Sequence, residues 1–412
     1  MMIDHMGKML FPQVPEMRIL GRIAFPLYAW CMVVGFHYTR NPWRYALRIL
    51  LVGLVSQPLY MVALNHTWHE PNIFLTLFFA LLALMAVEEK PIASRVASGN
   101  ALNLLKDMVP SLFGGSADLG PSNNSILKEA GWFSPEDRAG RNIHFGIREF
   151  AMAAMCNGMA LHGGVIPACG TFFVFSDYMK PAVRLSALMR LHVIYIWTHD
   201  SFRVGEDGPT HQPIEHEAQI RLMEHLRNHD ERSMVVLRPA DGDETVMAWK
   251  LAVEEQRPVA LVLSRQNIKS LPALGASRRE EAAQVAKGGY VVLDSAKPEV
   301  VMVATGSEVS TLVEGAELLA AEGIAVRVVN VPSEGLFRDQ PRSYQESVLP
   351  VGVVRYGLTS GLPVNLMGLV GEKGMIHGLD HFGYSAPYTV LDEKFGYNGK
   401  TVAEEVKKLL GK

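Results

Sequence analysis

Cysteine and an excess of charge of one sign are both scarce in this 412-residue sequence, and each scarcity excludes a class of protein. The three cysteines, Cys31, Cys156 and Cys169, are too few and too widely spaced for a disulfide framework or a metal-ligand motif. A net charge of −3 with 20% charged residues excludes a broadly basic nucleic-acid binder and a disordered tail. The length and the 49% hydrophobic content indicate two or three globular domains, in a reducing compartment.

The first 87 residues differ in composition from the rest. Six basic and three acidic residues give them a charge of +3, which leaves −6 for the remainder. They contain three almost uncharged apolar runs, at 23–36, 49–65 and 73–87. Each run is shorter than the roughly 20 residues that span a bilayer, but three in succession favour a membrane region over buried soluble helices. A cleavable signal peptide fits poorly because the apolar runs continue far along the chain.

The same segment contains five short motifs. They are IDHMG, FP, GRIAFP, SQP and NIFLTL, at residues 3–7, 11–12, 21–26, 56–58 and 72–77. Together they resemble part of the TraX-type family of membrane proteins, which is associated with pilin acetylation. The resemblance covers only residues 1–87 and implies a truncated helical segment that serves as an anchor or is a relic.

Basic residues predict how this segment would be oriented if it inserted. Arg40, Arg44 and Arg48 lie between the first two apolar runs, and short basic loops tend to remain cytoplasmic. The basic residues before the first run favour the opposite topology, but they can rest at the membrane interface. We therefore expect the region from residue 90 onward to be cytoplasmic.

From residue 88 onward the pattern is that of a soluble α/β protein. Short apolar runs bounded by polar turns, typical of buried parallel strands, lie at 142–147, 192–197, 234–237 and 259–263. Helical spacing of apolar residues is found at 150–161, 180–191 and 244–255, and Asp243 is a candidate cap for the last helix. This alternation predicts a doubly wound parallel sheet within residues 88–270.

A second α/β unit follows the first. The polar stretch at 271–284 predicts a linker between them. Strands expected at 290–293, 300–304 and 325–331 and a helix at 309–321 then begin a smaller domain that covers 285–412.

Polar residues gather directly after the predicted strands, where ligands bind in parallel α/β sheets. Five such clusters are present, at 114–123, 145–149, 171–178, 198–213 and 264–267. Turn formation, helix capping or core packing explains any one of them. Five such clusters in one sheet favour a shared binding site over five unrelated structural roles.

Several of these clusters contain side chains with specific chemistry. Glu149 stands between a strand and a helix, and Phe172, Phe175 and Tyr178 recur at three-residue spacing, as in a core or against a flat heteroaromatic ring. Two imidazoles and several carboxylates within 198–213 are hard to explain as turn chemistry alone. The guanidinium of Arg265 follows a strand, where it could bind phosphate.

The motifs GGSADL, GEDGPTHQP and SRQN, in this order, resemble the pyrimidine-binding domain of transketolase. ATGSE at 304–308 and HFGYSAP at 381–387 extend the resemblance to that family's C-terminal domain. As a set, the motifs distinguish the sequence from 1-deoxyxylulose-5-phosphate synthases and 2-oxoacid dehydrogenase β-subunits. The resemblance covers about residues 90–412 and implies two-carbon ketol transfer between sugar phosphates with thiamine diphosphate.

The resemblance also implies a role for each candidate residue. Glu149 would hydrogen-bond the aminopyrimidine ring of the cofactor, and His211 is the second catalytic candidate. The remaining cofactor-binding candidates are Asp118, Phe172, Phe175 and Tyr178. The candidates for sugar phosphate binding are Arg95, Ser122, His199, Asp207, His211 and Arg265.

One transketolase motif has no counterpart in the sequence. A Gly-Asp-Gly motif, which in that family helps to bind magnesium and the cofactor diphosphate, is absent, and residues 240–244 (ADGDE) are its nearest approach. We assign no metal ligands to this chain. A pyrimidine pocket alone cannot hold the charge of a diphosphate, so we expect a separate diphosphate-domain subunit in a homo- or hetero-oligomer. The alternative is an inactive or passenger transketolase fragment fused to a membrane protein.

Overall fold

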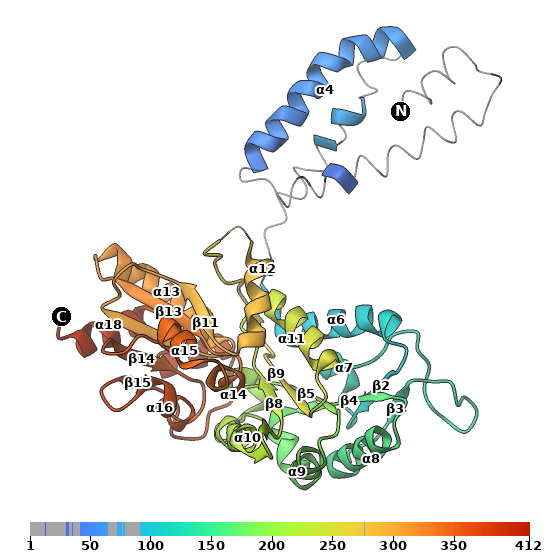
Figure 1. Cartoon of the computed structure of the whole chain (residues 1–412), viewed down its shortest axis with the longest axis vertical. Helices are drawn as coiled ribbons and strands as arrows, with labels where there is room; N and C mark the ends of the chain where they lie inside the picture. The colour runs from blue at the N-terminus through green and yellow to red at the C-terminus, as the bar shows by residue number, and fades with distance from the viewer. Residues whose placement is uncertain are drawn as a thin grey trace. The chain divides into compact units, whose positions relative to one another are not determined.

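The computed structural model describes residues 13, 30–32, 35, 42–64, 72–75, 77–78, 91–275 and 277–412 (Figure 1). The chain divides into two compact units, residues 1–90 and 91–412. In the first unit, helix α4 (Pro42–Leu64) covers most of the second apolar run, and Met32, Ala46 and Leu77 form a small buried cluster. The other two runs, Arg40 and most of the TraX-like motifs lie largely outside the described residues. No helix in the described part of the chain is long and apolar enough to cross a membrane.

The second unit begins with a six-stranded parallel sheet. Its spatial order is β3 (Asn142–His144), β2 (Leu112–Ser116), β4 (Ile166–Phe172), β5 (Ile194–Thr198), β9 (Val259–Leu263) and β8 (Val235–Leu237). Every residue of β5, β8 and β9 is buried, as expected of strands that helices cover on both faces. Chain order reverses between β2 and β4, which places a topological switch point at their carboxyl ends.

Helices cover both faces of this sheet (Figure 1). One face carries α6 (Ser94–Met108) and α11 (Gly242–Glu254), and the other carries α8 (Glu149–His162), α9 (Lys180–Met189) and α10 (His216–His225). Strand β5 has apolar side chains on both faces, which is why helices cover both. Ile194 and Ile196 pack with α6 and α11, whereas Tyr195 and Trp197 pack with the other three helices. This alternation follows from the two-residue period of a strand.

Short elements lie at the margins of the sheet. At its carboxyl edge are α7 (Gly120–Asn123) and the 3-10 helices η1 (Phe173–Tyr178) and η2 (Phe202–Asp207). The two-residue strand β1 (Ile92–Ala93) pairs antiparallel with β10 (Asn267–Ile268). A hairpin joins β6 (Arg227–Asn228) to β7 (Glu231–Arg232).

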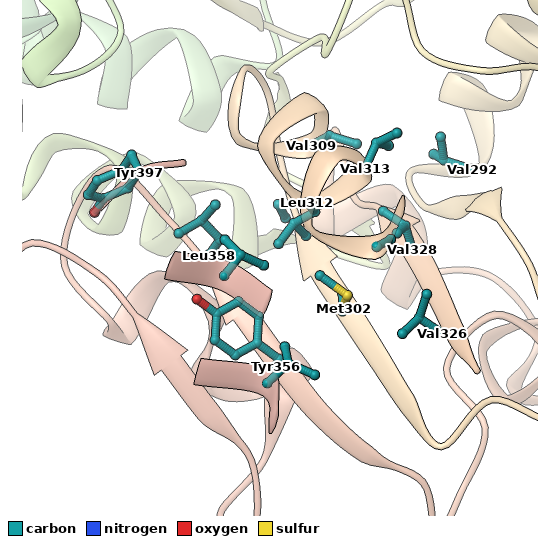
Figure 2. Packing of buried hydrophobic residues seen from close by; sticks show 14 of the residues in the cluster. Val292, Met302, Val309, Leu312, Val313, Val326, Val328, Tyr356, Leu358 and Tyr397 are labelled. Atoms are coloured by element: carbon teal, nitrogen blue, oxygen red, sulfur yellow. The ribbon is translucent and has the colours of Figure 1, made fainter. Parts of the chain in front are cut away.

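A five-stranded sheet forms the C-terminal domain. Its order is β11 (Tyr290–Leu293), β13 (Val326–Asn330), β12 (Val300–Ala304), β14 (Val354–Leu358) and β15 (Met375–His377), and β11 alone of these is antiparallel to its neighbour. Helices α13 (Glu308–Ala321) and α18 (Gly399–Leu410) cover one face. The other face carries α14 (Glu334–Arg338), α15 (Arg342–Val348) and α16 (Val364–Val370), and α17 (Tyr388–Phe395) precedes α18. Figure 2 shows the first face, where Leu312 of α13 lies next to Met302 of β12.

The expected α/β architecture with a parallel sheet and a C-terminal domain is confirmed, with local corrections. The strand expected at 142–147 ends at His144, because the chain turns at Gly146 with a φ of 66°. Asp241, not Asp243, caps α11, and its extended φ of −156° lets its carboxylate accept the Glu244 N–H.

The stretch expected to be a linker also has structure of its own. It contains α12 (Arg278–Ala282) and leads into η3 (Ala283–Lys287). The guanidinium of Arg278 is buried in ion pairs with Asp241 and Glu244 of the first domain. Its pKa is raised because these carboxylates outweigh the opposing effect of burial.

Candidate functional site

A cavity of about 550 Å³ opens at the carboxyl edge of the six-stranded sheet, beside the switch point. It is lined by Ala117, Asp118, Leu119, Ile147, Glu149, Phe175 and Tyr178. Four of the five cofactor-binding candidates are therefore gathered around one space. Two carboxylates face mainly apolar and aromatic walls, which is a common composition for a small-molecule site.

The two carboxylates are held there by the backbone. Glu149 is the first residue of α8, directly after the turn at Gly146, so the positive end of the helix dipole lies at its carboxylate. Asp118 has a φ of 62°, in the left-handed region that only short polar residues and glycine adopt readily. Such backbone strain concentrates at functional sites.

The aromatic candidates form a continuous stack along η1. Phe175 and Tyr178 line the cavity, with ring centroids 6.2 Å apart. Phe172 lies behind them: it is buried and stacks on Phe175 with centroids 5.9 Å apart and planes inclined by 6°. Phe172 therefore supports the aromatic wall without lining the cavity.

His211 connects this wall to a second group of candidates. Its ring meets Phe175 edge-on at 5.5 Å and Phe172 edge-on at 6.2 Å, and Nδ1 lies 2.8 Å from Thr210 Oγ1. Asp207 is exposed at the end of η2, in the same loop.

His199 lies in the second group, where its environment is cationic. It is buried, with a φ of 63°. Burial, followed by the positive charges of Arg95 and Arg265 and by His211, lowers the pKa of His199 to about 3. The imidazole is therefore neutral at neutral pH, beside two guanidinium groups. Such a site is suited to an anion.

Two serines bring the guanidinium groups together from distant parts of the sequence. Ser94 and Ser264 hydrogen-bond through their hydroxyls at 3.0 Å, and Ser264 N–H donates to Ser94 Oγ at 2.7 Å. Arg95 and Arg265 are the next residues, one at the start of α6 and the other just after β9. Burial and the charge of Arg265 both lower the pKa of Arg95. Mutual repulsion of this kind is relieved when an anion binds.

Ser122 contributes through its main chain. Its carbonyl accepts a hydrogen bond from Arg95 Nη1 at 2.5 Å, which fixes the guanidinium beside α7. Arg265 Nη1 lies 3.9 Å from Glu206 Oε2, and both side chains are partly exposed, so this contact restrains Arg265 only weakly.

A directed chain of hydrogen bonds sets the tautomer of His199. Ser116 Oγ donates to Gly170 O at 2.9 Å and accepts from Asn123 Nδ2 at 3.0 Å. Asn123 Oδ1 then accepts from Thr198 Oγ1 at 2.6 Å. Since that hydroxyl has given up its single proton, its oxygen must accept from His199 Nδ1, 2.8 Å away. Neutral His199 therefore carries its proton on Nδ1 and presents Nε2 as an acceptor.

Reasoning from the sequence missed this chain. Asn123 and Thr198 lay inside polar clusters, but their 75-residue separation gave no sign of a contact. It also missed the contacts of the 201–213 loop with the C-terminal domain, because several of them join residues that are more than 170 positions apart in the sequence. Within the described residues, one group of His, Asp and Glu side chains could hold a metal ion, namely Asp177, Glu215 and His216, and none of the three lines the cavity.

Comparison with known proteins gives three family matches. Residues 90–270 match the transketolase pyrimidine binding domain, 288–398 match the transketolase-like TK C-terminal domain, and 1–111 match TraX protein. The transketolase of Geobacillus stearothermophilus is 48% identical over 327 residues, which is 78% of this chain and 47% of that protein. For the Bacillus subtilis transketolase the identity is 46% over 325 residues, again 78% and 47%. The chain thus spans about half the length of these curated relatives.

Solved structures agree with these matches. A Pichia stipitis transketolase in complex with xylulose 5-phosphate is similar with a TM-score of 0.72 and 36% identity, over 78% of this chain and 46% of that one. A split-gene transketolase, solved as an inactive β4 tetramer, is similar with a TM-score of 0.60 and 26% identity. That match covers 78% of this chain and 99% of the other.

Proposed function

Because residues 90–270 and 288–398 belong to the transketolase family, we propose that this chain is one half of a two-chain transketolase. In this proposal it transfers two-carbon ketol units between sugar phosphates, with thiamine diphosphate, only when a diphosphate-domain subunit is present. The observation that carries the proposal is the adjacency of two features: the aromatic cavity that contains Glu149, and the cationic group around His199. His211 contacts the aromatic wall that joins them.

The cavity fits the pyrimidine half of the cofactor. Phe175 and Tyr178 offer flat faces to a heteroaromatic ring, and the Glu149 carboxylate can accept a hydrogen bond from a protonated ring nitrogen. When bound, thiamine diphosphate supplies the nucleophilic carbon that the transfer needs. Glu149 would hold the proton that sets the cofactor's tautomer, and Asp118 would face the same space.

The sugar phosphate would extend from this cavity toward the cationic group. Arg95 and Arg265 would bind the phosphate oxygens, with the carbonyl of Ser122 keeping Arg95 in place. A bound dianion would favour protonation of His199 at Nε2, because it reverses the electrostatic environment that keeps this nitrogen unprotonated. Asp207 and His211 would contact the sugar hydroxyls.

A partner subunit would supply the diphosphate and magnesium site. The chain covers 47% of the Geobacillus stearothermophilus transketolase but matches 99% of the split-gene chain. At the cavity mouth, Ile147 is 78% exposed and Tyr178 is 64% exposed. Exposed apolar residues are also present on the neighbouring α8 and α9, among them Phe150, Leu161, Leu185 and Leu188. Apolar surface of this extent is suited to a partner domain.

Reconstitution tests the proposal. The purified chain should show no two-carbon transfer from a ketose phosphate to an aldose phosphate, and addition of the diphosphate-binding half of the Geobacillus stearothermophilus transketolase should restore it. Two-carbon transfer by the partner-free chain would contradict the proposed requirement for a diphosphate-domain subunit. Failure of the two halves to bind or to react, with each half shown to be folded, would contradict the function itself.

A second candidate function rests on the TraX match at residues 1–111. In it, the transketolase-like part is an inactive passenger of a membrane-associated protein. Purification of the full-length polypeptide from cells distinguishes the two candidate functions. The first candidate requires that a diphosphate-domain subunit co-purifies with it. In both cases we place residues 91–412 in the cytoplasm, where sugar phosphates are present.

A further inference from the structure

We propose that the C-terminal domain sets the shape of the sugar loop, defined here as residues 201–213, and that Ser385 and Gln212 are positioning residues for Asp207 and His211. The inference rests on the proposed function, because that function assigns Asp207 and His211 to the sugar. It gives the C-terminal domain a part in substrate recognition although its side chains do not line the cavity.

The start of the loop is fastened by buried side chains. Phe202 is fully buried and packs against Phe395 and Tyr397, with ring centroids 5.2 and 4.7 Å apart. Arg203 donates from Nε to Asp392 at 2.6 Å and from Nη1 to Glu308 at 2.9 Å. All four partners belong to the C-terminal domain. Buried charge pairs with several hydrogen bonds impose a defined geometry on the segment that carries them.

The middle and the end of the loop are fastened by hydrogen bonds. Ser385 Oγ donates to the carbonyl of Glu206 at 2.5 Å. Gln212 Nε2 donates to Gly205 O at 3.0 Å and to Tyr384 O at 2.9 Å. The Gln212 amide thus joins Gly205, in the first half of the loop, to Tyr384 of the C-terminal domain.

Glycines allow the two segments to touch. Gly205 and Gly208 have φ of 84° and 75°, and a Cβ at Gly208 would lie 3.2 Å from Ser385 Cβ. A Cβ on Gly383 would lie 1.8 Å from Gln212 Oε1, which real atoms cannot tolerate. Glu206 and Asp207 are exposed between these fastened points. The backbone that carries Asp207 and His211 is therefore held by contacts on the C-terminal side, whereas the His211 ring itself lies against Phe172 and Phe175.

Removal of the Ser385 hydroxyl tests the contact without a partner subunit. In the full chain, Ser385→Ala should raise amide hydrogen exchange in the 201–213 peptide about fivefold, the equivalent of one ordinary hydrogen bond. Ser385→Thr, which retains a hydroxyl, should exchange like the wild type. Ser347→Ala is the matched control, because Ser347 Oγ donates to Tyr344 O elsewhere in the same domain. Unchanged exchange in Ser385→Ala would overturn the proposal.

A double-mutant cycle tests the Gly383 contact. Gly383→Ala should raise amide hydrogen exchange in the 201–213 peptide, because its methyl group displaces the Gln212 amide. Gln212→Ala should raise this exchange as well, since both hydrogen bonds from Nε2 are lost. Exchange in the double variant should be no faster than in Gln212→Ala alone. Independent, multiplicative effects of the two changes would overturn the proposed contact.

Kinetics of the reconstituted enzyme test the consequence for the sugar. Ser385→Ala should raise KM for the ketose phosphate donor several-fold and leave kcat unchanged. A lower kcat at unchanged KM would contradict a positioning role. If the reconstituted wild type has no activity, the proposed function fails, while the exchange experiments still decide whether the C-terminal domain shapes the loop.

Discussion

The imidazole of His199 stacks on the ring of Phe172, with centroids 3.6 Å apart and planes inclined by 26°. Phe172 in turn stacks on Phe175, which lines the cavity proposed for the pyrimidine ring. One aromatic side chain therefore contacts both the cofactor side and the phosphate side of the candidate site. A displacement at either end is transmitted through close packing.

The carboxylate of Glu149 is the candidate for cofactor activation. In the reconstituted enzyme, Glu149→Gln should lower kcat by roughly 100-fold or more, the usual contribution of a positioned acid or base. Steady-state assays at saturating cofactor measure this. Glu254→Gln, on the exposed face of α11, is the control and should behave as the wild type. A wild-type kcat for Glu149→Gln would refute the assignment.

Arg265 should act on binding rather than on turnover. Arg265→Ala should raise KM for phosphorylated substrates about tenfold and change kcat little, because a charge-assisted hydrogen bond to phosphate is lost. An unphosphorylated ketose donor should show the same KM with both enzymes. Equal increases in KM for the phosphorylated and unphosphorylated donors would show that the guanidinium does not bind the phosphate.

His199 makes the stability of the chain depend on pH. Its pKa is about 3 in the folded chain against an ordinary value of 6.5, so below pH 6.5 the unfolded chain binds a proton that the folded chain does not. This contribution to stability is complete above pH 6.5 and is lost as the pH falls toward 3, by about 1.4 kcal/mol per pH unit. The free energy of unfolding, measured with denaturant, should therefore fall more between pH 7 and pH 5 for the wild type than for His199→Gln. Parallel losses in the two proteins would contradict a neutral, buried His199.

The Thr198 hydroxyl should fix the tautomer of His199. Nitrogen NMR shifts of the wild type should show the proton on Nδ1, because Thr198 Oγ1 accepts it. Thr198→Val removes this acceptor and should destabilise the chain by about 1–3 kcal/mol, the cost of an unsatisfied buried donor. Thr210→Val, beside the more exposed His211, is the matched control and should cost far less. A proton on Nε2 of the wild-type His199 would show that the hydrogen-bond chain is directed differently.

The fold from residue 91 onward was accessible to sequence reasoning because its strands are short, apolar and bounded by turns. The strand at 259–263 was expected at the residues where it occurs, and so was the one at 300–304. The gathering of Asp118, Glu149 and Phe175 followed from the rule that ligands bind at strand ends. Their individual roles remain predictions.

Contacts between distant residues were not accessible in this way. Arg95 was a candidate only through resemblance, since the Ser94–Ser264 pair that brings it to Arg265 spans 170 residues. The three-residue spacing of the aromatics placed them correctly on one wall, but it could not show that Phe172 lies behind Phe175. Likewise, the choice between two aspartates as the cap of α11 depends on backbone angles, which composition does not reveal.

The short strand β1 has a mechanical consequence. Its two residues pair with β10 immediately before Ser94, which pairs with Ser264. A pull on the chain from before residue 91 is therefore carried by these bonds and does not reach Arg95 directly. We therefore expect the guanidinium of Arg95 to keep its place in a chain that begins at residue 91, because β1 and the Ser94–Ser264 pair hold the backbone on its N-terminal side.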